Sequence, residues 1–357
     1  MNLKTNFDGI ILENPVMPAS GPLVGDFEKL EFLANEGLGG LVTKTISSKE
    51  PHIPRPCIYG GKDYVMNSEL WSEHSYKIWV NDFLPRFKKS FPNKPLIISV
   101  GYTKEDMELL IPLLDQFADA FEISTHYVGT DLSVIENTVR AIRANTTKPI
   151  YMKISPHLPD PVGFGNAILR GGANGVVAIN SLGPTMKIDV KTKSIIYANE
   201  SGFVWTSGPA IKNLALATVY RIKQEFPQMT VLGVGGISSA EDVLEFILAG
   251  ASGVQMLSAA MLKGKQLYKK IISDLPKVLE QYGFSSIEDV INTTLVKKVS
   301  YEWVLPTLIL EQCTECMLCE KICPYHAITF TDRITFDPEK CFSCGLCISK
   351  CPVKAIY

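Results

Sequence analysis

Eight cysteines near the end of the chain have a spacing that suits iron–sulfur chemistry. They form two runs of the pattern C-x2-C-x2-C-x3-C-P, at Cys313, Cys316, Cys319, Cys323, Cys341, Cys344, Cys347 and Cys351. Each cysteine of the first run recurs 28 residues later, Cys313 as Cys341, which indicates an internal duplication. Thiolates at this spacing bind iron–sulfur clusters. We therefore expect two [4Fe-4S] clusters.

The ligands of these clusters are expected to be shared crosswise between the two runs. The first three cysteines of a run can bind three corners of one cluster, and the fourth ligand comes from the other run. Cys351 then completes the first cluster, and Cys323 completes the second. Residues 327–337 alternate apolar and polar around a turn, which predicts a hairpin between the runs. Paired zinc sites are the alternative, but zinc usually takes two separated C-x-x-C pairs. The segment resembles a bacterial-type ferredoxin.

A second group of polar residues lies in the first 285 residues, each after a short apolar segment. Lys44 and Lys153 are the most informative of them, because an ammonium group at the end of a buried strand needs an anionic partner. The alternative is that these lysines reach the solvent at the rim of the fold. The glycines of residues 233–237 (GVGGI) fit a phosphate-binding loop. They lack the last glycine of the dinucleotide pattern, so a mononucleotide phosphate fits better.

The elements that must position these residues alternate between strand and helix. Strands are predicted at 16–19, 39–44, 96–100, 120–124, 150–154, 175–180, 230–233 and 253–256. Helices are predicted between them, for example at 104–117, 132–145, 211–226, 240–249 and 265–282. This alternation predicts an α/β fold, a (β/α)8 TIM barrel over 1–285, whose site lies at the carboxyl ends of the strands. A helical connector is expected over 286–312, followed by a small α+β ferredoxin-like domain with two [4Fe-4S] clusters over 313–357.

The composition excludes several classes of protein. The chain has 357 residues, of which 46% are hydrophobic and 20% charged, so it is neither disordered nor fibrous. Its 35 basic and 37 acidic side chains lack the basic excess of a nucleic-acid-binding protein. No apolar run reaches the roughly 18 residues that span a membrane, and the start shows no secretion signal. We therefore expect a cytoplasmic protein that binds neither nucleic acid nor membrane.

The ordered set of motifs in the predicted barrel resembles the dihydroorotate dehydrogenase family. The matching segments are 14–22 (NPVMPASGP), 41–45 (LVTKT), 66–68 (MNS), 148–156 (KPIYMKISP), 176–181 (VVAINS), 206–212 (TSGPAIK), 231–237 (VLGVGGI) and 253–260 (GVQMLSAA). With its ferredoxin tail, the chain looks most like the pyrimidine-reducing portion of dihydropyrimidine dehydrogenases.

The resemblance implies FMN at the barrel mouth and assigns residues to it. Residues implied at or near the flavin ring are Ala19, Ser20, Gly21, Lys44, Ser124, Lys153 and Asn180. Residues implied at the ribityl phosphate are Ser207, Gly208, Gly235, Gly236, Leu257 and Ser258. A cation beside the ring would stabilise the reduced, anionic flavin. The substrate is expected at Asn67, Ser68, Asn180 and Ser181.

The loop after the fourth strand departs from the family pattern. The family has a cysteine or serine base and two asparagines there, and Tyr127 stands at the position of the base. Ser124 and Gly129 stand where the asparagines would be, so only Asn67 and Asn180 remain of four pyrimidine-binding asparagines. A phenol with a pKa of about 10 is a natural proton donor at neutral pH. Tyr127 is therefore the expected donor, and the neighbouring His126 is the alternative.

We predict an FMN and iron–sulfur oxidoreductase that reduces or forms a C=C bond conjugated to a carbonyl. Its catalytic residues are Tyr127, His126 and Lys44. The chain has no NAD(P) or FAD fingerprint, so we expect an NAD(P)H-dependent flavoprotein reductase subunit or a ferredoxin as electron partner. The resemblance also implies a homodimer. The alternatives are a genuine dihydropyrimidine or dihydroorotate dehydrogenase, and an electron-transfer subunit without its own substrate.

Overall fold

The computed structural model describes residues 1–357, which form two compact units. The first unit is Met1–Leu295 and the second is Val296–Tyr357. Their boundary lies inside the segment 286–312 that was predicted as a connector. No helix of either unit is both long and apolar enough to cross a membrane.

The first unit is an eight-stranded parallel barrel, which confirms the predicted fold class. Its strands are β3 (Val16–Pro18), β4 (Leu41–Val42), β7 (Leu96–Val100), β8 (Ala120–Ile123), β9 (Ile150–Ile154), β10 (Gly175–Ala178), β15 (Thr230–Val234) and β16 (Gly253–Met256). Hydrogen bonds link them in the order β3-β16-β15-β10-β9-β8-β7-β4. The backbone N–H of Gly39 donates to the carbonyl of Val16 at 3.0 Å, which brings the two end strands together. The carboxyl ends of all eight strands therefore surround one mouth.

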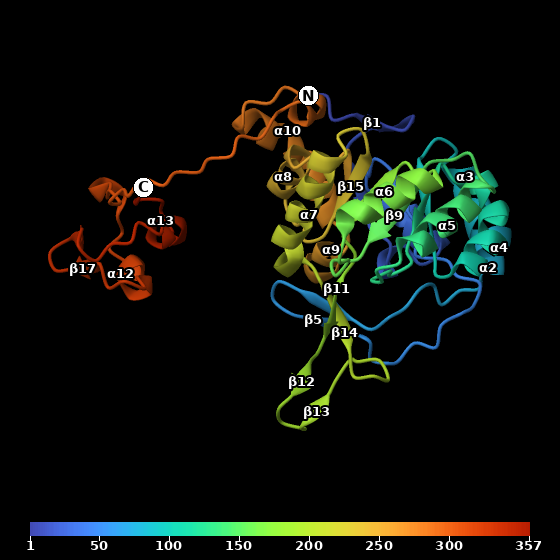
Figure 1. Cartoon of the computed structure of the whole chain (residues 1–357), viewed down its shortest axis with the longest axis horizontal. Coiled ribbons are helices and arrows are strands. Elements are labelled where there is room, and N and C mark those ends of the chain that lie inside the picture. Colours follow the sequence, from blue (N-terminus) through green and yellow to red (C-terminus); the bar gives the residue numbers. More distant parts are fainter. The chain divides into compact units, whose positions relative to one another are not determined.

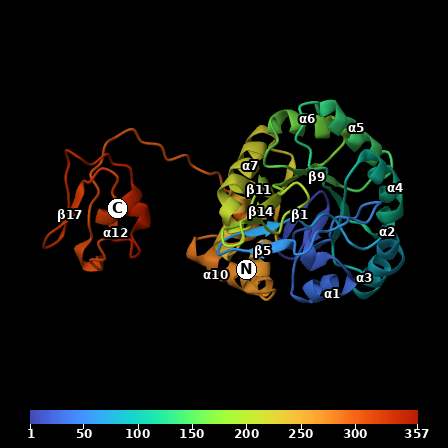
Figure 2. The same ribbon diagram turned by 90° about the horizontal axis from the view of Figure 1, so that it is seen from below.

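A ring of helices covers the outside of these strands (Figure 2). The helices are α1 (Phe27–Asn35), α3 (Leu84–Ser90), α4 (Lys104–Leu114), α5 (Leu132–Arg143), α6 (Pro161–Gly171), α7 (Lys212–Glu225), α8 (Ala240–Leu248) and α10 (Leu267–Gln281). Shorter helical segments are η1 (Pro22–Val24), α2 (Tyr76–Ile78), the π-helix η2 (Trp79–Phe83), η3 (Asp115–Phe117), η4 (Pro209–Ile211), α9 (Ser258–Lys263) and α11 (Ile287–Ile291). Side-chain caps fix several helix starts, as where Thr103 and Asp106 form a capping box on α4. The main core lies between this ring and the strands.

The barrel is closed at one end and extended at the other. At the amino ends of the strands, β1 (Thr5–Phe7) and β2 (Ile10–Leu12) form a hairpin whose turn residue Asp8 accepts a hydrogen bond from the Tyr151 hydroxyl at 2.9 Å. A separate four-stranded sheet contains β5 (Ile58–Gly60), β6 (Val65–Asn67), β11 (Leu182–Thr185) and β14 (Val204–Ser207). The hairpin of β12 (Ile188–Asp189) and β13 (Ser194–Ile195) projects away from the barrel beyond that sheet (Figure 1).

The second unit repeats one motif twice around a hairpin. Its elements are η5 (Leu310–Gln312), α12 (Leu318–Ile322), β17 (Ile328–Phe330), β18 (Ile334–Phe336) and α13 (Leu346–Lys350). The N-cap residues Met317 and Gly345 occupy equivalent places in the two repeats, and both have left-handed backbone with φ of 56° and 76°. The antiparallel pairing of β17 with β18 confirms the predicted hairpin.

The helical connector predicted over 286–312 is wrong for most of its length. Only α11 and the 3-10 turn η5 are helical there, and residues 293–307 form neither helix nor strand. The side chains of Val296, Val299 and Tyr301 are 79%, 71% and 99% exposed, so a helix here would bury no apolar face. Leu308 instead forms a β-bridge with Ile356 and belongs to the second unit.

Candidate active site and cluster-binding unit

A cavity of about 590 Å³ opens at the carboxyl ends of the barrel strands. The predicted residues that line it are Ala19, Ser20, Gly21, Lys44, Asn67, Ser124, His126, Lys153, Asn180, Ser181, Ser207, Gly208, Gly235, Gly236, Leu257 and Ser258. Residues far apart in the sequence thus meet in one place because the parallel strands end together. A more open groove of about 890 Å³ lies beside α4 and α5 and contains none of these residues. The cavity at the mouth is therefore the candidate active site.

One part of this cavity is built from glycines and hydroxyl groups. Gly208, Gly235 and Gly236 have φ of 94°, 126° and 84°, a region that favours glycine. A Cβ on Gly236 would lie 2.6 Å from the Cβ of Lys212, so the chain has no room for a side chain there. The hydroxyl groups of Ser207 and Ser258 lie 2.8 Å apart on the same wall. Bare backbone beside two hydroxyls is the donor set that suits a phosphate group.

Lys153 is held by a buried carboxylate inside the barrel. Its ammonium donates to Glu122 Oε1 at 2.9 Å, and Gln255 Nε2 donates to Glu122 Oε2 at 2.8 Å. The Glu122 side chain is fully buried, and that of Lys153 is 7% exposed. The three residues come from β9, β8 and β16, so the strands themselves fix the ion pair. Lys153 therefore does not reach the rim, and it has the anionic partner that its position required.

Lys44 is held by two carboxylates from a loop at the mouth. Its ammonium donates to Glu69 Oε1 at 2.7 Å and to Glu73 Oε2 at 2.6 Å, and its side chain is 2% exposed. Partial burial raises the pKa of Glu73, but the hydrogen bond from Lys44, a backbone hydrogen bond and the charge of Lys44 together hold this pKa below its ordinary value. The backbone N–H of Glu69 donates to Asn67 Oδ1 at 2.6 Å, which fixes the start of the loop. Lys44 thus carries a neutralised charge.

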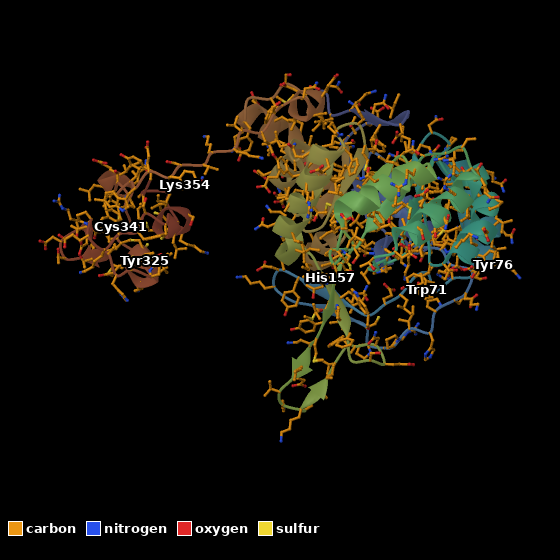
Figure 3. The ribbon with its side chains drawn as sticks, viewed as in Figure 1. Trp71, Tyr76, His157, Tyr325, Cys341 and Lys354 are labelled. Atoms are coloured by element: carbon orange, nitrogen blue, oxygen red, sulfur yellow. The ribbon has the colours of Figure 1, made fainter.

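An aromatic wall stands beside these carboxylates. The rings of Trp71 and Tyr102 stack at a centroid distance of 5.6 Å, and the ring of His126 lies 5.8 Å from that of Tyr102. All three line the cavity. Trp71 Nε1 donates to the carbonyl of Lys49 at 2.6 Å, so the indole is anchored at its polar end. Trp71 lies on the loop between β6 and α2 (Figure 3).

His126, in the loop after β8, faces the cavity. Its Nε2 lies 3.3 Å from Asn180 Nδ2, so this ring nitrogen can accept a hydrogen bond from the amide. The imidazole is open to solvent through the cavity, yet the surrounding protein desolvates it and Lys153 repels its proton. Desolvation, with a smaller contribution from Lys153, lowers the pKa of His126 to about 4. His126 is therefore neutral at pH 7.

Two predicted site residues point elsewhere. The Tyr127 hydroxyl donates to the carbonyl of Asp131 at 2.5 Å, and Tyr127 lines the groove beside α4 and α5 rather than the cavity. The short loop before α5 turns the phenol back onto its own backbone. Ser68 is 1% exposed and donates to the carbonyl of Tyr197 at 2.6 Å, so it ties two loops together outside the cavity. Neither side chain lines the cavity.

One of the two expected groups of cysteines lies around a single cavity of the second unit. One small cavity is lined by Cys323 together with Cys341, Cys344 and Cys347, which is one cysteine of the first run with three of the second. Backbone N–H groups donate to cysteine sulfurs at equivalent positions of the two repeats: Glu315 to Cys313, Ser343 to Cys341, Ala327 to Cys323 and Ala355 to Cys351, at 3.2–3.4 Å. Such bonds stabilise thiolate ligands, so this donor set fits two clusters. Figure 3 labels Cys341 and the neighbouring Tyr325.

Comparisons with known proteins agree with this geometry. The family model for dihydroorotate dehydrogenase matches residues 2–279, and the model for a 4Fe-4S dicluster domain matches residues 312–355. The chain belongs to the dihydroorotate dehydrogenase family. Dihydroorotate dehydrogenase B (NAD(+)), catalytic subunit, from Pyrococcus horikoshii is 35% identical over 306 residues, covering 82% of this chain and 98% of the relative. Dihydroorotate dehydrogenase A (fumarate) from Lactobacillus helveticus is 32% identical over 308 residues, with 82% and 98% covered.

Family membership defines the cofactors and the reaction type. As a member of the dihydroorotate dehydrogenase family with a dicluster domain, the chain is an FMN flavoprotein with 4Fe-4S clusters and an oxidoreductase that acts on CH–CH bonds. The glycine and hydroxyl wall and the two lysines offer the groups that a phosphate and a flavin ring need. The Pyrococcus relative is covered almost completely by 82% of this chain. The rest of this chain therefore has no counterpart in the Pyrococcus relative.

Sequence reasoning missed several residues of the site, chiefly Glu69, Glu73, Glu122, Tyr102 and Gln255. A signal for the first two was present, because acidic residues four apart follow the MNS segment and the buried Lys44 needed an anion. The sequence cannot show which carboxylate meets which lysine, since the pairs are formed by the folding of loops and strands. Tyr102 follows β7 and carried no motif.

Proposed function

We propose that this chain interconverts a saturated and an unsaturated carbon–carbon bond next to a carbonyl group. Electrons pass between the barrel site and an external partner through the clusters of the second unit. The observation that carries the proposal is the single cavity where Lys44, Lys153, Asn180 and His126 meet beside a phosphate-binding wall. Membership of the dihydroorotate dehydrogenase family, whose cofactor is FMN, supports a flavin in this cavity.

The cofactor is held by two sets of residues in this proposal. Ser207, Gly208, Gly235, Gly236, Leu257 and Ser258 bind the phosphate end, and Ala19, Ser20, Gly21, Lys44, Ser124, Lys153 and Asn180 surround the ring. When bound, FMN supplies hydride transfer to or from carbon, and the clusters supply one-electron transfer. Lys153 is the fixed positive charge of the ring site, because Glu122 orients its ammonium from inside the barrel.

His126 moves the proton of the reaction in this proposal, in place of Tyr127. It faces the cavity, whereas the Tyr127 hydroxyl is bound to the carbonyl of Asp131. With its pKa lowered to about 4, His126 is neutral at pH 7 and can accept a proton from the carbon next to the carbonyl. Asn67 and Asn180 orient that carbonyl, and the backbone N–H of Ser181 holds the Asn180 side-chain oxygen at 2.8 Å.

A separate protein exchanges electrons with this chain in our proposal. The Pyrococcus horikoshii relative is named a catalytic subunit, and the NAD(+) in its name does not occur in that of the Lactobacillus relative, which names fumarate. Relatives at this identity thus differ in electron acceptor. We propose an NAD(P)H-dependent flavoprotein reductase subunit or a ferredoxin as partner, a homodimeric barrel, and a cytoplasmic setting in which the eight cysteines stay reduced.

A genuine dihydroorotate dehydrogenase is the second candidate, because the relatives of that name cover most of this chain. The loop after β8 argues against a pyrimidine substrate. It contributes His126 and Val128 to the cavity lining, whereas a pyrimidine ring needs several polar partners there. Each unmatched polar group of the ring costs about 1–3 kcal/mol.

An anaerobic absorbance experiment tests the proposal. Chemically reduced holoenzyme is mixed with orotate and uracil, and then with cyclic and linear enoyl amides, ketones and acids. Reoxidation of the flavin by an activated alkene other than a pyrimidine supports the proposal. Reoxidation by orotate alone restores the second candidate, and a flavin that reacts only with protein partners makes the chain an electron-transfer subunit.

A further inference from the structure

The loop at the mouth of the cavity places more negative than positive charge around Lys44. Lys44 and Lys153 are the only lysines or arginines that line it. Lys44 is paired with Glu69 and Glu73, and Lys153 is paired with Glu122, at distances of 2.6–2.9 Å. Lys153 and Glu122 balance each other inside the barrel. At Lys44, two carboxylates face one ammonium group, which leaves one unbalanced negative charge there, and neither lysine lacks an anionic partner.

The loop carboxylates also remove other sites for an anion. The backbone N–H of Glu69, which could otherwise donate to an anion, already donates to Asn67 Oδ1. Glu69 itself lines the cavity beside the aromatic pair of Trp71 and Tyr102. A substrate carboxylate near Lys44 would thus meet two carboxylates a few ångströms away, in a partly buried site where repulsion between charges is strong.

We infer that Glu69 and Glu73 are specificity-determining residues that make this site accept uncharged substrates and reject carboxylates. The inference rests on the proposed function, whose substrate it narrows to an enoyl compound without an acid group. Dihydroorotate carries a ring carboxylate, so the same charges would distinguish this chain's substrate from it. Glu69 and Glu73, which hold Lys44, would then select the substrate by its charge and not by its shape.

A matched pair of probes isolates the charge. Orotate and its carboxamide, orotamide, share one ring and differ in the charge of one substituent. Each is titrated into the oxidised wild-type holoenzyme, and the dissociation constant is read from the change in flavin absorbance. We expect orotamide to bind at least about tenfold more tightly than orotate, because a single close charge in a partly buried site has an effect of that size or larger.

Neutral variants assign the effect to the two carboxylates. Glu69→Gln, Glu73→Gln and the double variant keep the size of the side chains, and the double variant should reduce the orotamide preference at least about tenfold. Glu28→Gln is the matched control, because Glu28 pairs with Arg86 at 2.9 Å outside the cavity. It should leave the preference unchanged. Flavin content identifies any variant that has lost its fold, and the single variants then provide the test.

Each outcome decides the inference. Wild-type enzyme that binds orotate as tightly as orotamide overturns it, and so does a preference that survives in the double variant. Where wild-type enzyme binds neither probe, the double variant must gain orotate binding, and no gain overturns the inference. A flavin that exchanges no electrons with any small molecule contradicts the proposed function instead, while the binding titration still measures charge selection.

Discussion

The barrel and the cluster unit hold their reactive groups in different ways. In the barrel, Lys153 and Glu122 are paired by the protein inside the ring of strands, where a second apolar core also lies. In the second unit, the core cluster consists of only four buried side chains, those of Ile328, Ile334, Cys347 and Ile356. One of the four, Cys347, is an expected ligand of an iron–sulfur cluster. The barrel thus preforms its site, whereas we expect the second unit to depend on its iron–sulfur clusters for stability.

This difference follows from size. A unit of about 60 residues buries too small a fraction of its surface to be stable without a staple. Groups that bind only the native state stabilise it by mass action.

The largest effect is expected from removal of iron. Anaerobic chelation should unfold the second unit, because its small core loses the clusters that join the two repeats. Protease cleavage within residues 313–357 should accelerate at least about 100-fold, while the barrel stays intact. Limited proteolysis with mass spectrometry measures both. If the second unit resisted protease without iron, the contrast between the two units would be lost.

Double cysteine variants should show which cysteines share a cluster. Cys323→Ser with Cys341→Ser removes two ligands of one cluster, so about half of the iron should remain. Cys323→Ser with Cys313→Ser affects both clusters, so little iron should remain. Iron analysis of the purified proteins gives the answer. The opposite order of iron content would show that each run binds its own cluster.

The two lysines of the barrel should differ in what their loss does to stability. Lys153→Met leaves Glu122 charged and fully buried, which should lower the free energy of unfolding by about 3–5 kcal/mol. Lys44→Met leaves Glu69, which is 11% exposed, and Glu73, which is 37% exposed. Both lie on a loop that can turn them to water, so the effect of Lys44→Met should be less than half as large. Urea denaturation followed by tryptophan fluorescence measures this, because three of the four tryptophans lie in the barrel. Equal losses would show that Glu122 is no more isolated than the loop carboxylates.

Loss of His126 should affect the reaction and leave the fold unchanged. His126→Gln should slow flavin reduction by a saturated substrate at least about 100-fold, and Tyr127→Phe, the matched control, should change it less than about twofold. The proton-accepting form of His126 is the neutral one, which is lost as the pH falls through about 4. The wild-type rate should therefore be flat between about pH 6 and 8. Stopped-flow absorbance measures both, and a slow Tyr127→Phe variant would return the role to Tyr127.

Much of the fold follows from local sequence patterns. The eight strands begin and end close to their predicted positions, because fully buried parallel strands form short apolar runs bounded by polar residues. The hairpin between the cysteine runs was also predictable, because apolar and polar residues alternate from Ala327 to Asp337. The helix predicted over 286–312 is absent for most of that length, because helical spacing gives a helix only where its apolar face is covered by other residues.

The site could be predicted where a residue follows a barrel strand, and less well where it lies on a loop. Lys44, Lys153 and Asn180 meet because the strand ends converge. Tyr127 and Ser68 lie one residue from side chains that do face the cavity, His126 and Asn67. In extended or irregular backbone, neighbouring side chains point in different directions, and motif position alone does not show which one enters.

The most direct test of the account is an anaerobic comparison of two substrates of equal shape. Oxidised wild-type holoenzyme is mixed with dihydroorotate and, separately, with its carboxamide, and the loss of flavin absorbance is followed in time. We predict that the carboxamide reduces the flavin at least about tenfold faster, because the mouth of the cavity repels a carboxylate. Reduction by dihydroorotate at an equal or greater rate would contradict the account.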